Sequence, residues 1–572
     1  MSLPLLLVLI QVFIFTSLGS SKAQAADMVK IGMLEEPRTL NIWLASDTWS
    51  LRVLRLMYNP LYIREPKDLK FIPWLAEGDP VYDASTLSYT IKLRPAKWSD
   101  GSDFTSEDVA FTGDLIKEFK IPRYYSNWKF IKRIETIDKY TVRFFLNEPR
   151  AIFMGRTLST PIVQKKEWEN VVEGVRKAGD PLDELLRYRM EKPVGTGPFV
   201  LKEWKQGDSL LLQKNEHFFA ENKEIAGHLL GPYVDGIIFK IFGTSDAAVS
   251  ALKQGAVDMF WWNIQPEYLP DLEKDPYIQT YVNEKSAVYY LGLNLRKKPF
   301  NDVHFRQAVA YLIDRDFITV KILLGYGNKM NSIVPPGNSS WFCPDIPGYG
   351  EVLIWKERMV KAYDILSKAG YTWKVPPVQA DEVDNGEGLI LPDGSVMEDF
   401  TILTPEPDYD PHRAMAGQMI QERLREAGIP ATSKPMKFGS LLEQVKGRHE
   451  FDMFILGYGR LSLDPDYLRN FFHSGQDRPR GLNMSGYHNP EFDRIADESA
   501  AVMDTRKRQG LIWEMQTILM RDVPYLPLYS PKVVEGVRKD KFSGWVEMLG
   551  GIGNIWSFCE IKPVSAWKNF LK

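Results

Sequence analysis

Apolar and polar residues alternate along several short segments in the first third of the chain. Residues 87–93 (LSYTIKL) follow a period of two, and residues 141–146 (TVRFFL) are rich in β-branched and aromatic side chains. Such patterns are typical of strands with one buried face. Apolar residues at 200–201 and 210–212 flank the turn-forming run 205–208 (KQGD), which predicts a β-hairpin. We therefore expect the early part of the chain to be rich in β-sheet.

Later in the chain the apolar residues recur at helical spacing. The stretches 305–313, 492–503 and 512–520 each place their apolar residues on one helical face, which predicts three core helices. Gly325 is expected to cap the C-terminal end of the first. Residues 373–398 contain Pro-Pro, Asn-Gly and Asp-Gly pairs and predict a long irregular surface excursion. The chain is thus expected to be of mixed α/β class.

The first residues are typical of an export signal. Residues 3–18 are almost wholly apolar, and Ala23-Gln24-Ala25 places small residues where a signal peptidase cleaves. The apolar run is short for a membrane-spanning helix. We therefore expect cleavage of residues 1–25 and a periplasmic protein, and without a cysteine near this segment we expect no lipid anchor.

Length and charge narrow the class of protein. The chain has 572 residues, more than one hydrophobic core usually serves, so two or three core units are expected. Its formal net charge is -3, which provides no basic excess for phosphate backbones and argues against a nucleic-acid partner. No stretch beyond the N-terminal segment is long and apolar enough to span a membrane.

The chain has two cysteines, Cys343 and Cys559. In an oxidising compartment an even count permits one disulfide, whereas two separate buried thiols are the other interpretation. Spacing along the chain does not decide between them, because a disulfide requires the two Cα atoms to lie within about 7 Å.

Sequence motifs for chemistry are largely missing. The sequence contains no phosphate-binding loop, no G-x-S-x-G nucleophile motif, no dinucleotide glycine fingerprint and no H-E-x-x-H zinc motif. None of its seven histidines lies at the short helical spacing of zinc ligands. We therefore predict no enzyme activity, no catalytic residues, no metal site and no cofactor. An exported hydrolase stays a remote alternative.

Tryptophans are numerous and several lie beside polar residues. Of the 16 tryptophans, Trp49 lies in an S-D-T-W-S run, and Trp261 and Trp262 precede an asparagine. Flat amphipathic rings can line a wide cleft and bind varied ligands through buried area. Packing between domains is the alternative role of each ring.

Several segments, in order along the chain, match the motifs of one known family. Residues 98–111 combine an Asp-Gly turn with a helix that Thr105 or Ser106 can cap and whose first turn is acidic. The other matching segments are 36–41 (EPRTLN), 57–61 (MYNPL), 193–199 (PVGTGPF), 251–258 (ALKQGAVD), 290–294 (YLGLN), 305–315 and 486–490 (GYHNP). Together these segments resemble the extracellular solute-binding proteins of the oligopeptide, dipeptide and nickel-binding family.

The resemblance implies an α/β, two-lobed periplasmic binding protein fold with mixed sheets, of the large type with a subdomain inserted in the first lobe. Lobe I would comprise 26–70, 195–286 and 531–572, the inserted subdomain 71–194, and lobe II 287–530. Such proteins close by hinge motion on a ligand held between the lobes. The implied function is to capture a peptide-like solute, as a monomer, and deliver it to the permease of an ABC importer.

The resemblance also points to a ligand-binding segment, 456–467 (LGYGRLSLDPDY). Peptide-binding relatives hold the ligand's α-amino group with an aspartate three residues before an acidic-Pro pair. Here Asp464-Pro465 matches that pair, but the aspartate position is Leu461, which cannot pair with an ammonium group. Either Asp464, Asp466 or another acid takes this role, or the motif is shifted in register, or the ligand has no free amino terminus at this point. Arg460 would suit a carboxylate or phosphate group.

The predicted ligand-binding residues are therefore Trp49, Trp261, Trp262, Tyr458, Arg460, Asp464 and Asp466. A peptide-like ligand is the first hypothesis. The missing aspartate and the abundant tryptophans favour an oligosaccharide as the alternative, and Arg460 favours an opine or similar small anion. Metal-chelate binding is a weaker option, since the histidines are scattered.

Overall fold

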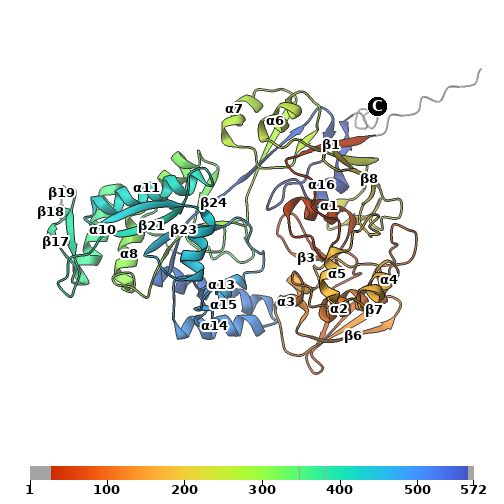
Figure 1. The fold of residues 1–572 in the computed structure, drawn as a ribbon, viewed down its shortest axis with the longest axis horizontal. Coiled ribbons are helices and arrows are strands. Elements are labelled where there is room, and N and C mark those ends of the chain that lie inside the picture. Colours follow the sequence, from red (N-terminus) through yellow and green to blue (C-terminus); the bar gives the residue numbers. More distant parts are fainter. Residues whose placement is uncertain (1–26, 347, 381, 565–572) are drawn as a thin grey trace, which may run out of the picture.

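Two β-sheets covered by helices form the two halves of the molecule, and the computed structural model describes residues 27–346, 348–380 and 382–564 (Figure 1). We use lobe I for the half built on a seven-stranded sheet of order β14-β25-β13-β1-β12-β9-β8. Its strands are β1 (Met28–Met33), β8 (Phe199–Lys205), β9 (Ser209–Lys214), β12 (Gly236–Ile241), β13 (Met259–Phe260), β14 (Ile278–Asn283) and β25 (Val533–Arg538). β1 is parallel to β12 and β13, whereas β12 is antiparallel to β9, so the sheet is mixed.

Lobe II is built on a six-stranded sheet of order β16-β24-β15-β23-β21-β22. Alternate residues of β23 enter different cores, with Met453 and Ile455 in one and Phe454 and Leu456 in the other. Burial of both faces explains why this strand is continuously apolar. The strands are β15 (Val288–Leu293), β16 (Gly327–Lys329), β21 (Phe400–Pro405), β22 (Ala431–Met436), β23 (Met453–Tyr458) and β24 (Tyr525–Pro531).

A separate four-stranded antiparallel sheet packs beside lobe I and has the order β4-β5-β7-β6. Helix α2 (Ser106–Glu118) covers it and begins at a capping box, in which the backbone N–H of Thr105 donates to Asp108 Oδ2 at 2.9 Å. Gly101 precedes the helix with φ +83°, as the Asp-Gly turn requires. The strands are β4 (Val81–Asp83), β5 (Ser88–Lys92), β6 (Ile131–Asp138) and β7 (Thr141–Leu146).

The remaining helices complete both halves (Figure 1). Those of lobe I and its four-stranded part are α1 (Thr48–Met57), α3 (Tyr125–Trp128), α4 (Lys165–Val175), α5 (Pro181–Arg187), α6 (Ser245–Lys253), α7 (Leu269–Leu272) and α16 (Ile555–Glu560). Those of lobe II are α8 (Val303–Leu312), α9 (Arg315–Phe317), α10 (Trp355–Lys368), α11 (Pro411–Glu426), α12 (Phe438–Leu442), α13 (Tyr467–Phe472), α14 (Pro490–Ala501) and α15 (Thr505–Asp522). Within the described residues, no helix is sufficiently long and apolar to cross a membrane.

Two crossover segments join the lobes. Residues 284–287 connect β14 to β15, and Lys532 alone connects β24 to β25. The two segments run side by side, because β14 pairs with β25 in one sheet and β15 pairs with β24 in the other. The Ser530 hydroxyl bridges them by donating to the carbonyl of Lys285 at 3.1 Å.

The lobes also touch away from the crossovers. The backbone N–H of Ala151 donates to the carbonyl of Ala500 at 3.1 Å, and the Ser340 hydroxyl donates to the carbonyl of Asp68 at 3.1 Å. Met503 of lobe II packs against the core of lobe I. The space between the lobes is thus bounded by the crossovers and by direct contacts of the two lobes.

The α/β fold expected from the sequence is confirmed, and so are most predicted elements. β5, β7 and the β8–β9 hairpin lie at the predicted strands, and α8, α14 and α15 lie at the predicted helices. One cap was wrong: α8 ends at Leu312, and Gly325 follows a separate π-helical turn at Ile318–Ile322. Both Cys343 and Cys559 are free and buried in separate cores, which answers the question of a disulfide.

The prediction of an irregular stretch at 373–398 was also wrong. Two small antiparallel sheets form there, one from β17 (Thr372–Val375) and β20 (Glu387–Ile390), the other from β18 (Val378–Gln379) and β19 (Glu382–Val383). The strands are too short for a clear alternating pattern, so the turn residues between them dominated the sequence signal.

We expect Gly195→Ala to destabilise the protein by about 1–3 kcal/mol through overpacking. A Cβ at position 195 would lie 1.8 Å from the carbonyl oxygen of Met57, at the end of α1. Gly174→Ala in α4 is the matched control, because a Cβ there meets nothing within 4 Å, and it should stabilise the helix slightly. Urea denaturation curves of the two variants measure the difference, and equal midpoints would contradict this packing.

Candidate functional site

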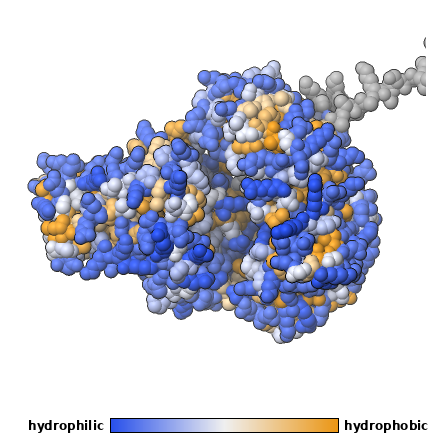
Figure 2. Space-filling model, in the orientation of Figure 1, coloured by the Kyte–Doolittle hydropathy of each residue, from blue (hydrophilic) through white to orange (hydrophobic). Residues whose placement is uncertain are grey.

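A hollow lies between the two lobes (Figure 2). Helix α1 of lobe I, the crossover residues 284–287 and the residues that follow β23 of lobe II carry the charged groups that meet there. The arrangement after β23 is set by a hydrogen bond from the backbone N–H of Leu461 to the carbonyl of Ser286 at 2.6 Å, which continues the pairing of β15 with β23. The preceding residue, Arg460, is therefore held beside a crossover.

Arg52 of α1 lies among three tryptophan rings. The centre of its guanidinium is 4.9 Å from the ring centroid of Trp49, 4.8 Å from that of Trp261 and 5.3 Å from that of Trp262. One guanidinium nitrogen also donates to the carbonyl of Trp261. These cation–π contacts and this hydrogen bond fix the orientation of the charge.

Four more cationic side chains lie near Arg52, and they come from both lobes. Arg55 is one helical turn further along α1, with Arg460 and Arg123 near it, and Lys285 lies near Arg52 and Arg460. Arg123 precedes α3 and donates to the carbonyl of Ala45 at 3.2 Å.

Burial, and then repulsion by neighbouring cations, lowers the pKa values of Arg52 and Arg55. The pKa of Arg55 falls to about 9, first because of burial and then because of the charges of Arg460 and Arg123. The pKa of Arg52 falls to about 10, mainly because of burial, with Glu535 opposing the shift. Arg55 still keeps water-accessible surface, as expected of a side chain surrounded by protein within a cleft. With pKa values of about 9 and about 10, Arg55 and Arg52 remain protonated at neutral pH.

Among the described residues, none of these five cations has a carboxylate within 4 Å. The carboxylate whose negative charge acts on Arg52 is that of Glu535 on β25. Glu535 is 1% exposed and accepts a hydrogen bond from the backbone N–H of Ile552 at 2.6 Å. Burial raises the pKa of the Glu535 carboxyl to about 7, against the opposing charge of Arg52. At neutral pH this carboxyl therefore compensates only part of one positive charge.

The three tryptophans predicted to line the cleft serve mainly to hold Arg52. Trp261 is 4% exposed and packs in the core of lobe I against Phe239 and Phe558, so its expected place on the cleft surface was wrong. Trp49 is 5% exposed, and its ring lies 4.9 Å from the partly exposed ring of Trp262.

Tyr458 is half-buried at the end of β23. Its ring stacks on Phe471 with centroids 4.4 Å apart and lies nearly parallel to Tyr290 at 6.1 Å. Burial raises the pKa of its hydroxyl to about 12. Phe471 thus covers one face of the ring, and the side chain as a whole is only partly exposed.

Asp464 is placed differently from the expectation that it replaces the missing aspartate. It is 4% exposed, and its two carboxylate oxygens accept hydrogen bonds from Arg508 of α15 at 2.7 and 2.8 Å. A carboxylate held in this bidentate way has little capacity left for a ligand ammonium. Asp466 pairs with Arg469 at 3.1 Å at the start of α13, and Leu461 is buried in the core of lobe II.

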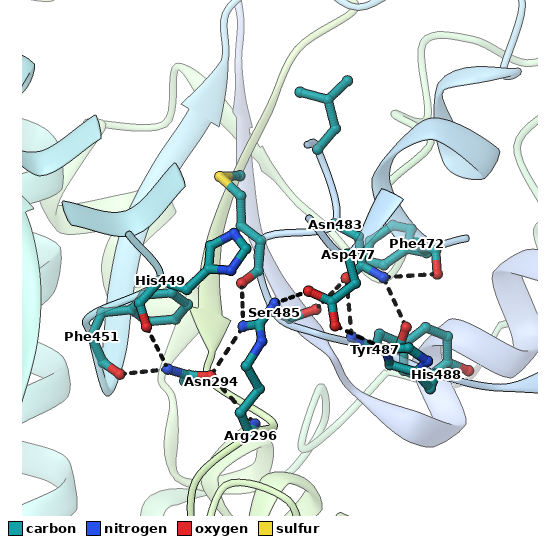
Figure 3. A network of polar contacts seen from close by, with 12 residues as sticks. Asn294, Arg296, His449, Phe451, Phe472, Asp477, Asn483, Ser485, Tyr487 and His488 are labelled. Atoms are coloured by element: carbon teal, nitrogen blue, oxygen red, sulfur yellow. Dashed lines mark hydrogen bonds and ion pairs between the residues drawn. The ribbon is translucent and has the colours of Figure 1, made fainter. Parts of the chain in front are cut away.

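A second concave region lies on lobe II and has a volume of about 610 Å³. Its charged groups satisfy one another: Arg296 pairs with Asp477, and His488 Nε2 lies 2.8 Å from the other oxygen of Asp477 (Figure 3). Burial acts to raise the pKa of Asp477, but the hydrogen bonds from His488 and Arg296 outweigh it and hold the pKa below its ordinary value. These ion pairs hold together the loops that follow β15 and α13, so their role is structural.

Metal ligation finds no support in the described part of the chain. Within residues 27–346, 348–380 and 382–564, no three His, Cys, Asp or Glu side chains come together in a group that could hold a metal ion.

Comparison with known families decides the class of the protein. The family described as bacterial extracellular solute-binding proteins, family 5 Middle, matches residues 70–479. The chain belongs to this family. The resemblance seen in the sequence motifs is thereby confirmed.

Relatives of this family 5 protein match over nearly its whole length. It is 28% identical over 518 residues to the oligopeptide-binding protein AppA of Bacillus subtilis, covering 89% of this chain and 87% of that protein. It is 26% identical over 554 residues to the glutathione-binding protein GsiB of Escherichia coli O1:K1, covering 94% and 96%. The structure of a periplasmic oligopeptide-binding protein from Thermotoga maritima matches with a TM-score of 0.74 at 23% identity, covering 94% and 99%, and shows the shared fold.

Sequence reasoning found one of the five clustered cations, Arg460, and missed Arg52, Arg55, Arg123 and Lys285. A signal for two of them was present. In the apolar stretch 50–57 (SLRVLRLM), Arg52 and Arg55 are three residues apart and therefore share one helical face. Arginines are rarely buried unless they are paired. Two of them on one face of a largely buried helix therefore indicate either ion pairs or a functional site.

We expect Glu535 to make the protein less stable as pH rises from about 4.5 to about 7. In this range the folded state keeps a proton that the unfolded state has released, so the raised pKa costs up to about 3 kcal/mol once both states are ionised. Glu535→Gln should remove this part of the pH dependence, whereas Glu173→Gln on the exposed surface of α4 should not. Free energies of unfolding measured from pH 4.5 to 8 test it, and parallel curves for wild type and Glu535→Gln would contradict it.

Proposed function

We propose that this protein is the soluble receptor of an ABC importer, which captures a peptide-like solute between its lobes and delivers it to a membrane permease. The observation that carries the proposal is an interlobe space lined from both lobes by cationic groups that have no carboxylate within 4 Å among the described residues, in a member of a solute-binding family. A ligand that contacts both lobes favours the closed arrangement over the open one.

A peptide-like ligand is supported by the relatives, which are named for oligopeptide and glutathione binding. In this chain Arg460 lies near the arginines of α1, and the partly exposed Tyr458 lies two residues before it at the end of β23. Two lobes with the boundaries expected above, a monomeric state and a role without catalysis belong to the same proposal. The Asp464–Arg508 pair leaves no obvious carboxylate for a ligand ammonium in the 456–467 segment.

A small anion that is not a peptide is the second candidate. The observation that favours it is the cluster of Arg55, Arg123 and Arg460, which can bind carboxylates whatever their scaffold. The tryptophans give an oligosaccharide less support than the sequence suggested, because Trp49 and Trp261 hold Arg52.

We expect short peptides to be released when the purified protein is denatured. Their identification by mass spectrometry, with binding confirmed by calorimetry on the refolded protein, tests the proposal. Release of a non-peptide acid with no peptide, together with no calorimetric signal from a mixture of di- to pentapeptides, would contradict it in favour of the second candidate.

Export of the chain is part of this proposal, and the expected signal lies outside the described residues. Cleavage after Ala25 predicts a mature protein that begins at Ala26. Intact mass and N-terminal sequencing of protein recovered from a periplasmic extract measure this. Recovery of the uncleaved chain would contradict it.

A further inference from the structure

We propose that the ligand carries at least two anionic groups, which the guanidinium groups of Arg55, Arg123 and Arg460 bind from opposite sides of the interlobe space. The inference rests on the proposed function and adds the ligand's charge to it. It predicts acidic short peptides rather than neutral ones as the preferred class.

The clustered arginines come from both sides of the interlobe space. Arg52 and Arg55 project from one face of α1, while the hydrogen bond from Leu461 to Ser286 anchors Arg460 in the other lobe. Arg123 lies at a third corner, held by its bond to Ala45. These side chains are close enough for Arg460 to interact with Arg52, Arg55 and Arg123 at once.

Among the described residues, Arg55, Arg123 and Arg460 keep exposed surface and have no carboxylate within 4 Å. Two of the buried arginines, Arg306 and Arg315, bind carbonyl groups, whereas others are ion-paired. Arg508 has Asp464, Arg413 has Asp410, and Arg358 has Asp316. In the described residues the cluster faces only Glu535, whose carboxyl is half-protonated near neutral pH. Removing a charge even partly from water without a counter-ion costs free energy. Groups held in this way are therefore candidates for ligand binding.

Among the residues that the structure describes, no group offsets the charge of three of the clustered cations. Arg52 is partly offset by Glu535 and by the tryptophan rings, and Lys285 also borders a small cavity beside the crossovers. Arg55, Arg123 and Arg460 remain as three uncompensated charges. A single carboxylate, as in a neutral peptide, would leave two of them facing each other in the closed form.

Closure itself depends on this compensation. Arg460 approaches Arg52 and Arg55 across the space between the lobes, so like charges oppose closure in the ligand-free protein. An anion between them reverses the sign of this interaction. The free energy of closure then includes the charge of the ligand as well as its contacts.

Calorimetry with matched peptides tests the inference. The probes are Ala-Glu-Glu and Ala-Gln-Gln, the pentapeptides Ala-Glu-Ala-Glu-Ala and Ala-Gln-Ala-Gln-Ala, and citrate as a tricarboxylate without a peptide bond. Arg55→Met and Arg460→Met remove one charge each at water-accessible positions while keeping side-chain volume. Arg187→Met, at an exposed position on α5, is the matched control.

We expect the glutamate peptides to bind at least about tenfold more tightly than the glutamine peptides, and each cluster variant to lose about tenfold for the glutamate peptides alone. Higher salt should weaken binding of the glutamate peptides to the wild type, and Arg187→Met should behave as the wild type does. Circular dichroism and thermal unfolding confirm that each variant is folded.

The other outcomes separate the inference from the proposed function. Equal affinity for glutamine and glutamate peptides would overturn the inference and leave peptide binding standing. Binding of citrate but of no peptide would retain the anion site and overturn the peptide ligand. Binding of none of the probes would overturn both.

Discussion

The arrangement of this molecule depends on one antiparallel ribbon that passes through both sheets. β14 and β25 form its part in lobe I, and β15 and β24 its part in lobe II. Because a single residue, Lys532, separates β24 from β25, the ribbon allows the lobes to bend and twist about the crossovers but gives little room to slide apart. Each lobe therefore keeps its own packed core while the residues at the ribbon stay in register.

The same ribbon places charge where the lobes meet. Lys285 lies within a crossover, Glu535 is on β25, and Arg460 is fixed to the crossover by the backbone bond of Leu461. Helix α1 then brings Arg52 and Arg55 from lobe I. The electrostatic character of the interlobe space is thus a property of the hinge and of α1 together, and neither lobe alone contains it.

Much of the fold could be predicted from the sequence, because burial repeats along a strand or helix and leaves a period. Strand β5 and helices α14 and α15 were predicted for this reason. The start of α2 was predicted instead from its local capping residues, with Thr105 or Ser106 as the cap. The short strands at 372–390 were not, since two to four residues carry no period. The site was predicted less well: Asp464 and Trp261 have partners, Arg508 and Arg52, that come from distant segments of the chain.

The hydrogen bonds from Ala151 to Ala500 and from Ser340 to Asp68 join the lobes without involving the ligand space. Their energy contributes to the population of each arrangement of the lobes that contains them, and the apparent dissociation constant of a ligand scales inversely with the population of the arrangement that it binds. Residues at this seam can therefore raise or lower affinity for every ligand by a common factor and leave discrimination between ligands unchanged. Uptake at low solute concentration and choice of solute are, in this architecture, separately adjustable.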